Sequence, residues 1–300
     1  MMKRTISGLL ALSAVLCLTG CVDKQLPDSG TSSSATLPVQ TQQETAAPAQ
    51  QDFHEIPLAD NENITVKVTS VKPDDSLGYS MNLYLENKSD STLMFTLDRV
   101  SVNGFMCDPF WAATVTPGMK ANESVTFLSS SLKDIGIDTV TDITFTLRVY
   151  PADDITEEDL LNQVCTIYPL GKDAVVPYVR ETVDGEIVLF DNEYATMVIE
   201  GSKEDTLWGY SLKVYLENKT NQNLLFSVGD AAVNGFMCDP FWAVEVAAGK
   251  RCVSDISWFA DTLKENGITE VESITLPVSV RNSDDWMADP LITETFTLNP

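Results

Sequence analysis

Histidine is almost absent from this sequence: of its 300 residues, only His54 is a histidine. Ser-His-Asp and Cys-His catalysis and histidine-based zinc sites all need an imidazole beside the other reacting groups. His54 lies at the edge of a Ser-, Thr-, Gln- and Pro-rich segment, so these sites are excluded from the rest of the chain. Glycine-rich phosphate loops (GxxxxGKS/T or GxGxxG) are missing too. We therefore predict no enzymatic activity and no cofactor; a hydrolase built on paired carboxylates stays open as a less favoured alternative.

Basic residues are scarce as well, with 19 Lys and Arg against 44 Asp and Glu and a formal net charge of −25. Nucleic acids and anionic lipid surfaces attract positively charged proteins, so neither is expected as a partner. Three acidic pairs, Asp74-Asp75, Asp153-Asp154 and Asp284-Asp285, lack the ligand alternation and the bidentate glutamate of an EF-hand loop. No metal site is predicted from them.

Only one apolar run is long, from Ile6 to Leu18, and its 13 residues are fewer than the roughly 20 needed to cross a bilayer. Lys3 and Arg4 precede it, which is typical of a signal peptide over residues 1–20. The residues at its end, Leu18-Thr19-Gly20-Cys21, resemble the bacterial lipobox. The resemblance implies that Cys21 is acylated and anchors the chain in membrane lipid, because two acyl chains give stable attachment. The alternative is an ordinary cleaved signal with an incidental cysteine.

Residues 21–53 are rich in Ser, Thr, Gln, Pro and Ala and poor in large apolar side chains. Such a segment cannot bury enough surface to offset the entropy of ordering it. A flexible chain of about 30 residues reaches roughly 30 Å, enough to lift a folded part off the lipid head groups. We interpret the segment as a tether. Signal removal would leave 17 basic against 44 acidic residues, a formal charge of −27.

What the chain does contain is a duplication. Eleven identical residues occur at Val102–Ala112 and again at Val233–Ala243, 131 positions later. The same spacing holds without a gap as far as Pro169 and Pro300. Each copy is long enough to be an independent domain. We predict a first repeat over 54–169, a restricted linker over 170–185 and a second repeat over 186–300.

Short segments with alternating apolar and polar residues fill each copy, and this period of two predicts half-buried strands. In the first repeat they are Ile64–Val68, Ser80–Leu85, Leu93–Val102, Ser124–Leu128, Ile143–Tyr150 and Val164–Tyr168. Six or seven strands in about 110 residues suggest a sandwich. The predicted fold is all-β, with two tandem antiparallel β-sandwich domains.

Helix is expected only as a turn or two at Ser130–Asp134. Thr156–Asp159 resembles a capping box, but Pro290 corresponds to Asp159 in the second copy and argues against a long helix in either repeat. Asp184-Gly185, between the β-rich runs Tyr178–Val183 and Glu186–Phe190, predicts a hairpin with an extra strand before the second repeat.

Several repeated features resemble uncharacterised immunoglobulin-like domains of Gram-positive bacterial lipoproteins: Tyr84–Lys88, the Val102-Asn103-Gly104 turn, Pro117–Lys120 and Asp153-Asp154, with their counterparts in the second copy. The resemblance covers about 220 residues and implies the immunoglobulin-like fold. It also implies a surface-anchored binding or display protein on the extracytoplasmic side of a Gram-positive cell membrane. It does not extend to the aromatic segment Phe105–Trp111.

That aromatic segment is the candidate binding site. Asn103-Gly104 supplies the two positive-φ positions of a type I′ turn, and large apolar residues follow it in both copies. They are Phe105, Met106, Phe110 and Trp111, and Phe236, Met237, Phe241 and Trp242. They either form an exposed patch for a surface protein, peptide or glycan, or cap the end of the core, which is the commoner role of such residues. An exposed patch favours a binding function, and a buried one favours a structural or accessory envelope lipoprotein.

Four cysteines lie in the repeats, and only Cys107 and Cys238 correspond in the internal alignment. A repeated disulfide framework is therefore excluded. Bridges from Cys107 to Cys165 and from Cys238 to Cys252 stay open outside the cytoplasm, but mostly free, buried thiols are favoured.

Overall fold

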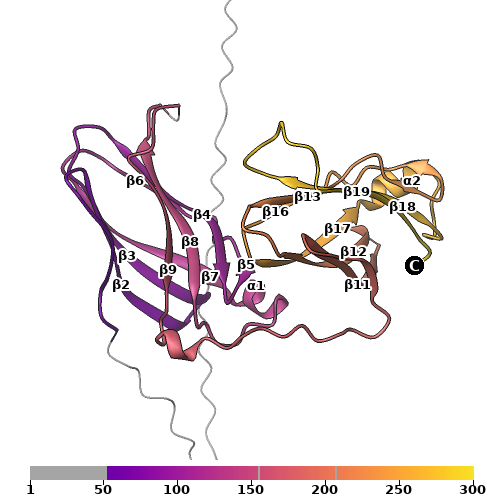
Figure 1. Ribbon diagram of the computed structural model, residues 1–300, viewed down its shortest axis with the longest axis horizontal. Helices are drawn as coiled ribbons and strands as arrows, with labels where there is room; N and C mark the ends of the chain where they lie inside the picture. The colour runs from indigo at the N-terminus through magenta and orange to yellow at the C-terminus, as the bar shows by residue number, and fades with distance from the viewer. Residues whose placement is uncertain (1–52, 155, 207) are drawn as a thin grey trace, which may run out of the picture. The chain divides into compact units, whose positions relative to one another are not determined.

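The computed structural model describes residues 53–154, 156–206 and 208–300 (Figure 1). The predicted signal peptide, Cys21 and nearly all of the tether lie outside the described residues. The described chain is all-β, with several antiparallel sheets in a sandwich-like arrangement and two short α-helices, α1 (Ser129–Asp134) and α2 (Ala260–Glu265). Neither helix combines the length and the apolar character that a membrane crossing requires.

In the first repeat one sheet has the order β1-β2-β3-β7, and a second is built around β4, which pairs with β5, β6 and β8, while β9 pairs with β8. The strands are β1 (Ile56–Asp60), β2 (Ile64–Asp75), β3 (Gly78–Asn87), β4 (Leu93–Val102), β5 (Phe105–Met106), β6 (Ala112–Val115), β7 (Lys120–Leu128), β8 (Ile143–Pro151) and β9 (Leu161–Ile167).

The second repeat follows the same order 131 residues later, to within one residue at each end, except that the counterpart of β4 is split in two. Its strands are β10 (Ile187–Asp191), β11 (Ala195–Asp205), β12 (Gly209–Asn218), β13 (Leu224–Val228), β14 (Ala232–Val233), β15 (Phe236–Met237), β16 (Ala243–Val246), β17 (Arg251–Trp258), β18 (Ile274–Asn282) and β19 (Ile292–Leu298). A short 3-10 helix, η1 (Lys172–Ala174), follows β9.

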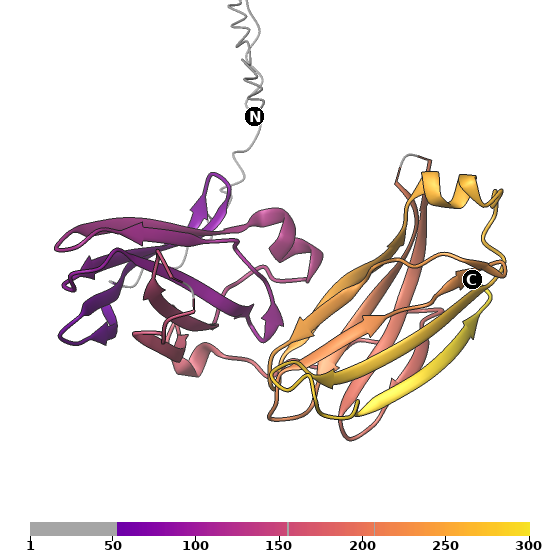
Figure 2. The same cartoon turned by 90° about the horizontal axis from the view of Figure 1, so that it is seen from above.

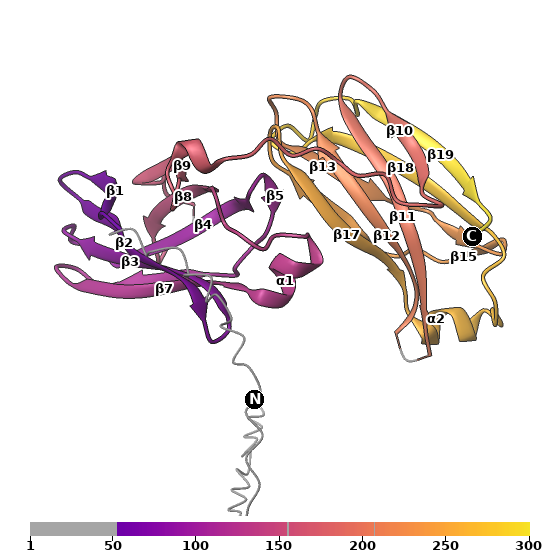
Figure 3. The same ribbon diagram turned by 90° about the horizontal axis from the view of Figure 1, so that it is seen from below.

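Two hydrophobic clusters hold these strands together. In the first, side chains from both sheets of the first repeat meet, among them Leu83 from β3 and Phe95 from β4. In the second, Leu216 from β12 meets Phe226 from β13. The strand layers can be followed within each repeat in Figures 2 and 3. The predicted alternation is confirmed in β8 and in most of β18, where every second side chain is buried and those between are half-buried. Burial of one face of each sheet is what stabilises a sandwich.

The short helix expected near Ser130–Asp134 is confirmed by α1. The capping-box sequence Thr156–Asp159 starts no helix, in line with the proline that corresponds to Asp159 in the second copy. Asp154 accepts hydrogen bonds from the backbone N–H and the hydroxyl of Thr156, at 2.9 and 2.6 Å. These local bonds close a turn, and the chain then enters β9 without a helix. Side chain-to-backbone bonds of this kind compete with helix formation.

The hairpin expected around Asp184-Gly185 also does not form, because the described residues 175–186 contain no strand. The Glu186 carboxylate instead accepts hydrogen bonds from the Arg180 guanidinium and, at 3.0 Å, from the Val183 N–H. These contacts fold the segment back on itself just before β10 begins at Ile187. A local ion pair between Arg180 and Glu186 therefore holds this segment, in place of the backbone hydrogen bonds between two strands of a hairpin.

The repeated Glu-Asn-Lys sequence at the ends of β3 and β12 has a structural role. The Asn87 side chain is fully buried, and its Nδ2 donates to the carbonyls of Ser91 and Val115, at 2.8 Å each. Asn218 donates in the same way to the carbonyls of Gln222 and Val246. A buried amide with satisfied hydrogen bonds specifies one loop conformation. Identity between the copies at this motif therefore needs no ligand to explain it.

Candidate functional site in the repeated hairpins

The turn that opens each aromatic segment has the geometry that the sequence predicts. Asn103 and Gly104 have φ of 49° and 81°, and Val102 pairs directly with Phe105 across them. Asn234 and Gly235 repeat this with φ of 51° and 82°. A two-residue turn with positive φ at both positions is type I′, as expected for Asn-Gly.

Each turn is fixed by its asparagine side chain. The Asn103 Oδ1 accepts a hydrogen bond from the Thr141 N–H at 2.8 Å, and its Nδ2 donates to the Thr139 carbonyl at 2.7 Å. Asn234 makes the matching bonds to the Glu272 N–H and the Glu270 carbonyl. The loops that follow are thus built on a rigid base in both repeats.

The Asp-Pro-Phe loops carry the most unusual geometry in this region. Phe110 and Phe241 both have φ of 49°, in the left-handed region, and their side chains are 94% and 91% exposed. A bulky residue at positive φ is an outlier, and holding one there costs about 1–3 kcal/mol. Asp108 Oδ1 accepts the Phe110 N–H at 2.7 Å, and Asp239 Oδ1 accepts the Phe241 N–H at 2.8 Å. Both repeats therefore hold a strained backbone that presents one phenylalanine ring to solvent.

The tryptophan that follows each of these phenylalanines packs inward. Trp242 is 7% exposed, and its Nε1 donates to the Ser254 hydroxyl at 3.1 Å. Trp111 is only partly buried against the first cluster, and the position that corresponds to Ser254 is Glu123. One hairpin thus contains both of the expected arrangements: an exposed phenylalanine, and next to it a tryptophan that packs on the core.

The residues at the start of the segment differ between the repeats despite their identical sequence. Phe105 is 4% exposed, whereas Phe236 is 50% exposed. Met106 packs against the second cluster, whereas Met237 is 66% exposed. The eight residues selected from the sequence therefore do not form one patch.

Phe105 is buried because Tyr178 of the linker and Tyr215 of the second repeat cover it. Its ring meets the rings of Tyr178 and Tyr215 edge-on, with centroids 4.9 and 6.5 Å apart. The Arg251 N–H donates to the Gly104 carbonyl at 2.9 Å, so that β5 and β17 pair in parallel at Phe105 and Arg251. This pairing joins a sheet of each repeat into one nine-stranded sheet.

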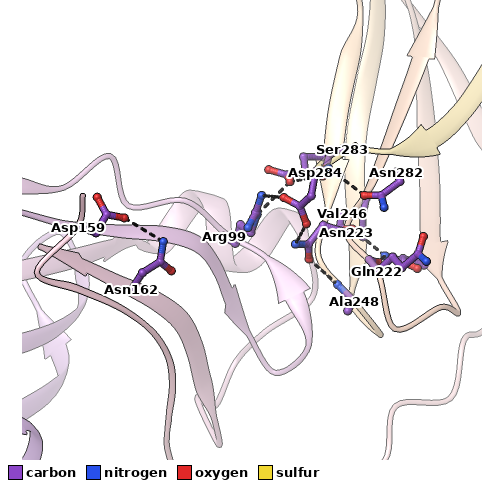
Figure 4. Close-up of polar contacts among 12 residues, drawn as sticks. Arg99, Asp159, Asn162, Gln222, Asn223, Val246, Ala248, Asn282, Ser283 and Asp284 are labelled. Carbon is purple, nitrogen blue, oxygen red and sulfur yellow. Dashed lines mark hydrogen bonds and ion pairs between the residues drawn. The ribbon is translucent and has the colours of Figure 1, made fainter. Parts of the chain in front are cut away.

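Arg99 adds an ionic contact between the repeats. Its Nε lies 3.0 Å from the Glu245 carboxylate. Its Nη2 lies 2.5 Å from the Asp284 carboxylate, as Figure 4 shows. Burial lowers the pKa of Arg99, but the two carboxylates raise it to above its ordinary value overall. No motif in the sequence predicts this contact. The available signal was that Arg99 corresponds to Asp230 within an otherwise closely matched stretch.

A polar cleft of about 560 Å³ surrounds Arg99, and its other lining residues include Asp98, Asp108, Arg148 and Asp159. Arg148 donates to Asp159 at 2.8 Å, which lowers the pKa of that carboxyl. The guanidinium groups of this cleft are thus already paired with carboxylates. Among the described residues no group of three His, Cys, Asp or Glu side chains is placed to hold a metal ion.

The four cysteines of the repeats are buried and unpaired: Cys107, Cys165, Cys238 and Cys252. Burial, assisted by Asp108, raises the pKa of the Cys107 thiol to about 11, and burial raises that of Cys252 to about 12. Both thiols are protonated at neutral pH and are poor nucleophiles.

Comparison with known proteins identifies no family for this chain. No protein-family model matches the chain, and no curated protein does either. Among solved structures, the transglutaminase of red sea bream is similar over 80% of this chain and 31% of its own, at 9% sequence identity and a TM-score of 0.25. The chain thus spans less than a third of that protein. A likeness this remote bears on neither the activity nor the site.

Proposed function

We propose that this protein is a lipid-anchored binding and display protein on the extracytoplasmic face of a Gram-positive cell membrane. In this proposal Cys21 carries the lipid, residues 21–53 form the tether, and each repeat is an immunoglobulin-like domain. The partner is bound by the two exposed phenylalanines, Phe110 and Phe241.

The observation that carries the proposal is the pair of strained Asp-Pro-Phe loops. A ring that is more than nine-tenths exposed adds nothing to the core, yet both repeats accept positive φ to hold it there. Strain of this kind persists where the surrounding structure enforces it, and it is concentrated at binding sites. A single protruding ring suits an apolar pocket on a protein partner better than the broad platform on which sugars stack. We therefore favour a surface protein, with glycans as the alternative outcome.

Removal of both rings should abolish binding while leaving the fold intact. The test measures retention of residues 50–300, the compact unit that holds every described strand, on cells of the producing bacterium that lack the anchored protein. Phe110→Ala and Phe241→Ala should each weaken retention by about tenfold or more, and the double variant should lose most of it because avidity is lost. Protease treatment of the cells should abolish retention, whereas loss on glycosidase treatment would indicate a glycan.

Met287→Ala is the matched control, because Met287 is also 94% exposed but lies between β18 and β19. If the double phenylalanine variant is retained as well as the parent, the loops are not the site. That result would favour a structural or accessory envelope lipoprotein.

Lipid anchoring is tested separately. Cys21→Ala should release the protein from the membrane fraction or leave the signal peptide uncleaved, because the thiol that takes the lipid is gone. Fractionation and N-terminal sequencing measure both results. A variant that stays membrane-bound with the parent's N-terminus would contradict lipid attachment at Cys21.

A further inference from the structure

The contact between the repeats uses two surfaces that the duplication supplies twice. One is the β5 hairpin, which inserts Phe105, and the other is strand β17, which pairs with β5, with Tyr215 beside it on β12. The counterpart of β5 is β15, where Phe236 is 50% exposed and Met237 is 66% exposed. The counterpart of β17 is β7, with Tyr84 in the place of Tyr215.

Both counterparts are open. In the sheets that the structure describes, β7 is the last strand of the order β1-β2-β3-β7, and β15 is the first of the order β15-β14-β18-β13-β16. Tyr84 is half-buried where Tyr215 is only 1% exposed. An edge strand presents unpaired N–H and C=O groups and is a template for pairing with another chain. Each end of the described chain thus carries an unused counterpart of the β5–β17 pairing. Tyr178, which also covers Phe105, lies in the linker outside the duplication.

We propose that a second copy of this chain binds at these open edges, with β15 of one molecule pairing in parallel with β7 of the next. The pairing would place Phe236 opposite Lys120, as Phe105 lies opposite Arg251. The Phe236 ring would then cover Tyr84, as Phe105 covers Tyr215. The two surfaces differ, so the contact is head-to-tail and leaves both ends of the dimer free to add further copies.

Substitutions between the repeats make this contact weaker than the one inside the chain. Asp230 stands in the place of Arg99, and Asp153 and Thr114 stand in the places of Asp284 and Glu245. Neither ion pair of Arg99 can therefore form in this contact, and Asp230 and Asp153 repel each other. The whole chain also carries a formal charge of −25, which opposes association. Association should therefore strengthen as salt screens these charges.

Sedimentation velocity on residues 50–300 over a range of concentrations tests the proposal. The parent should form dimers and longer species as concentration and salt rise, and Phe236→Ala should stay monomeric with an unchanged circular dichroism spectrum. Asp230→Arg should tighten association about tenfold, because it removes one repulsion and adds an ion pair with Asp153. The proposal is overturned if the parent and Asp230→Arg are both monomeric throughout, or if Phe236→Ala associates like the parent.

A mixing experiment tests the head-to-tail geometry. Tyr84→Ala removes the acceptor and keeps the hairpin, whereas Phe236→Ala does the reverse. Neither should associate alone, but an equimolar mixture should form a 1:1 dimer that cannot grow; a mixture that stays monomeric overturns the proposal. Phe241→Ala is the control within the same hairpin and should associate like the parent. Loss of association in Phe241→Ala would show that the exposed loop, and not the β15 edge, mediates self-association, and would overturn the proposal. The cell-retention test measures a different interaction, so its result would stand independently.

Discussion

Replacement of Phe105 with alanine should lower the free energy of unfolding by about 3–5 kcal/mol, the cost of deleting a large buried aromatic ring. Phe236→Ala, at the identical position of the second repeat, should lower it by less than about 1 kcal/mol, because half of that ring is already in solvent. The difference arises because Tyr178 and Tyr215 enclose Phe105, whereas Phe236 has no such cover in the described structure.

Denaturant unfolding followed by tryptophan fluorescence measures both variants. Phe105→Ala should also separate the unfolding of the two repeats, because the residues that couple them pack on this ring. Equal losses of stability in the two variants would contradict the contact between the repeats. Phe95→Ala serves as a reference, since Phe95 is fully buried within the first repeat and its loss should destabilise that repeat without uncoupling it from the second.

Trp242→Ala should lower the free energy of unfolding by a similar amount, about 3–5 kcal/mol. Trp242 is 7% exposed, and its removal also leaves the Ser254 hydroxyl without the indole donor. Trp111→Ala should cost clearly less, because Trp111 is only partly buried and Glu123 replaces the serine. Thermal unfolding of both variants gives the comparison, with Phe241→Ala as an exposed neighbour that should change stability little. A larger loss in Trp111→Ala than in Trp242→Ala would show that the packing of the two hairpins has been assigned the wrong way round.

Local patterns allowed much of the fold to be predicted. The alternation in Ile143–Tyr150 specifies a strand with one buried face, and β8 has it. Asn103-Gly104 specifies a type I′ turn, and the backbone adopts one. These predictions hold because each rests on neighbours in the chain. The hairpin expected around Asp184-Gly185 fails for the complementary reason: Arg180 and Glu186 pair with each other, and no local pattern of apolar residues records an ion pair.

The candidate site was harder to predict because burial is a property of the environment. Eight hairpin residues were selected by composition, but composition does not distinguish Phe110, which protrudes, from Trp111, which packs inward. The Asp-Pro pair before Phe110 was the nearest available signal, because an aspartate commonly accepts a hydrogen bond from the backbone two residues on. Even so, the exposed fraction of the ring depends on what the rest of the chain places around it.

The sequence by itself determined the duplication, the all-β character and the two Asn-Gly turns, since repeat spacing, residue periodicity and turn chemistry are encoded locally. It also carries the predicted lipid anchor at Cys21, which lies outside the described residues. Only the tertiary structure decided that identical segments have different surroundings. Val102–Ala112 packs against the second repeat, whereas Val233–Ala243 leaves at least half of the Phe236 and Met237 side chains exposed. The reason is physical: two identical segments present the same groups, but a contact forms only where a partner surface is within reach.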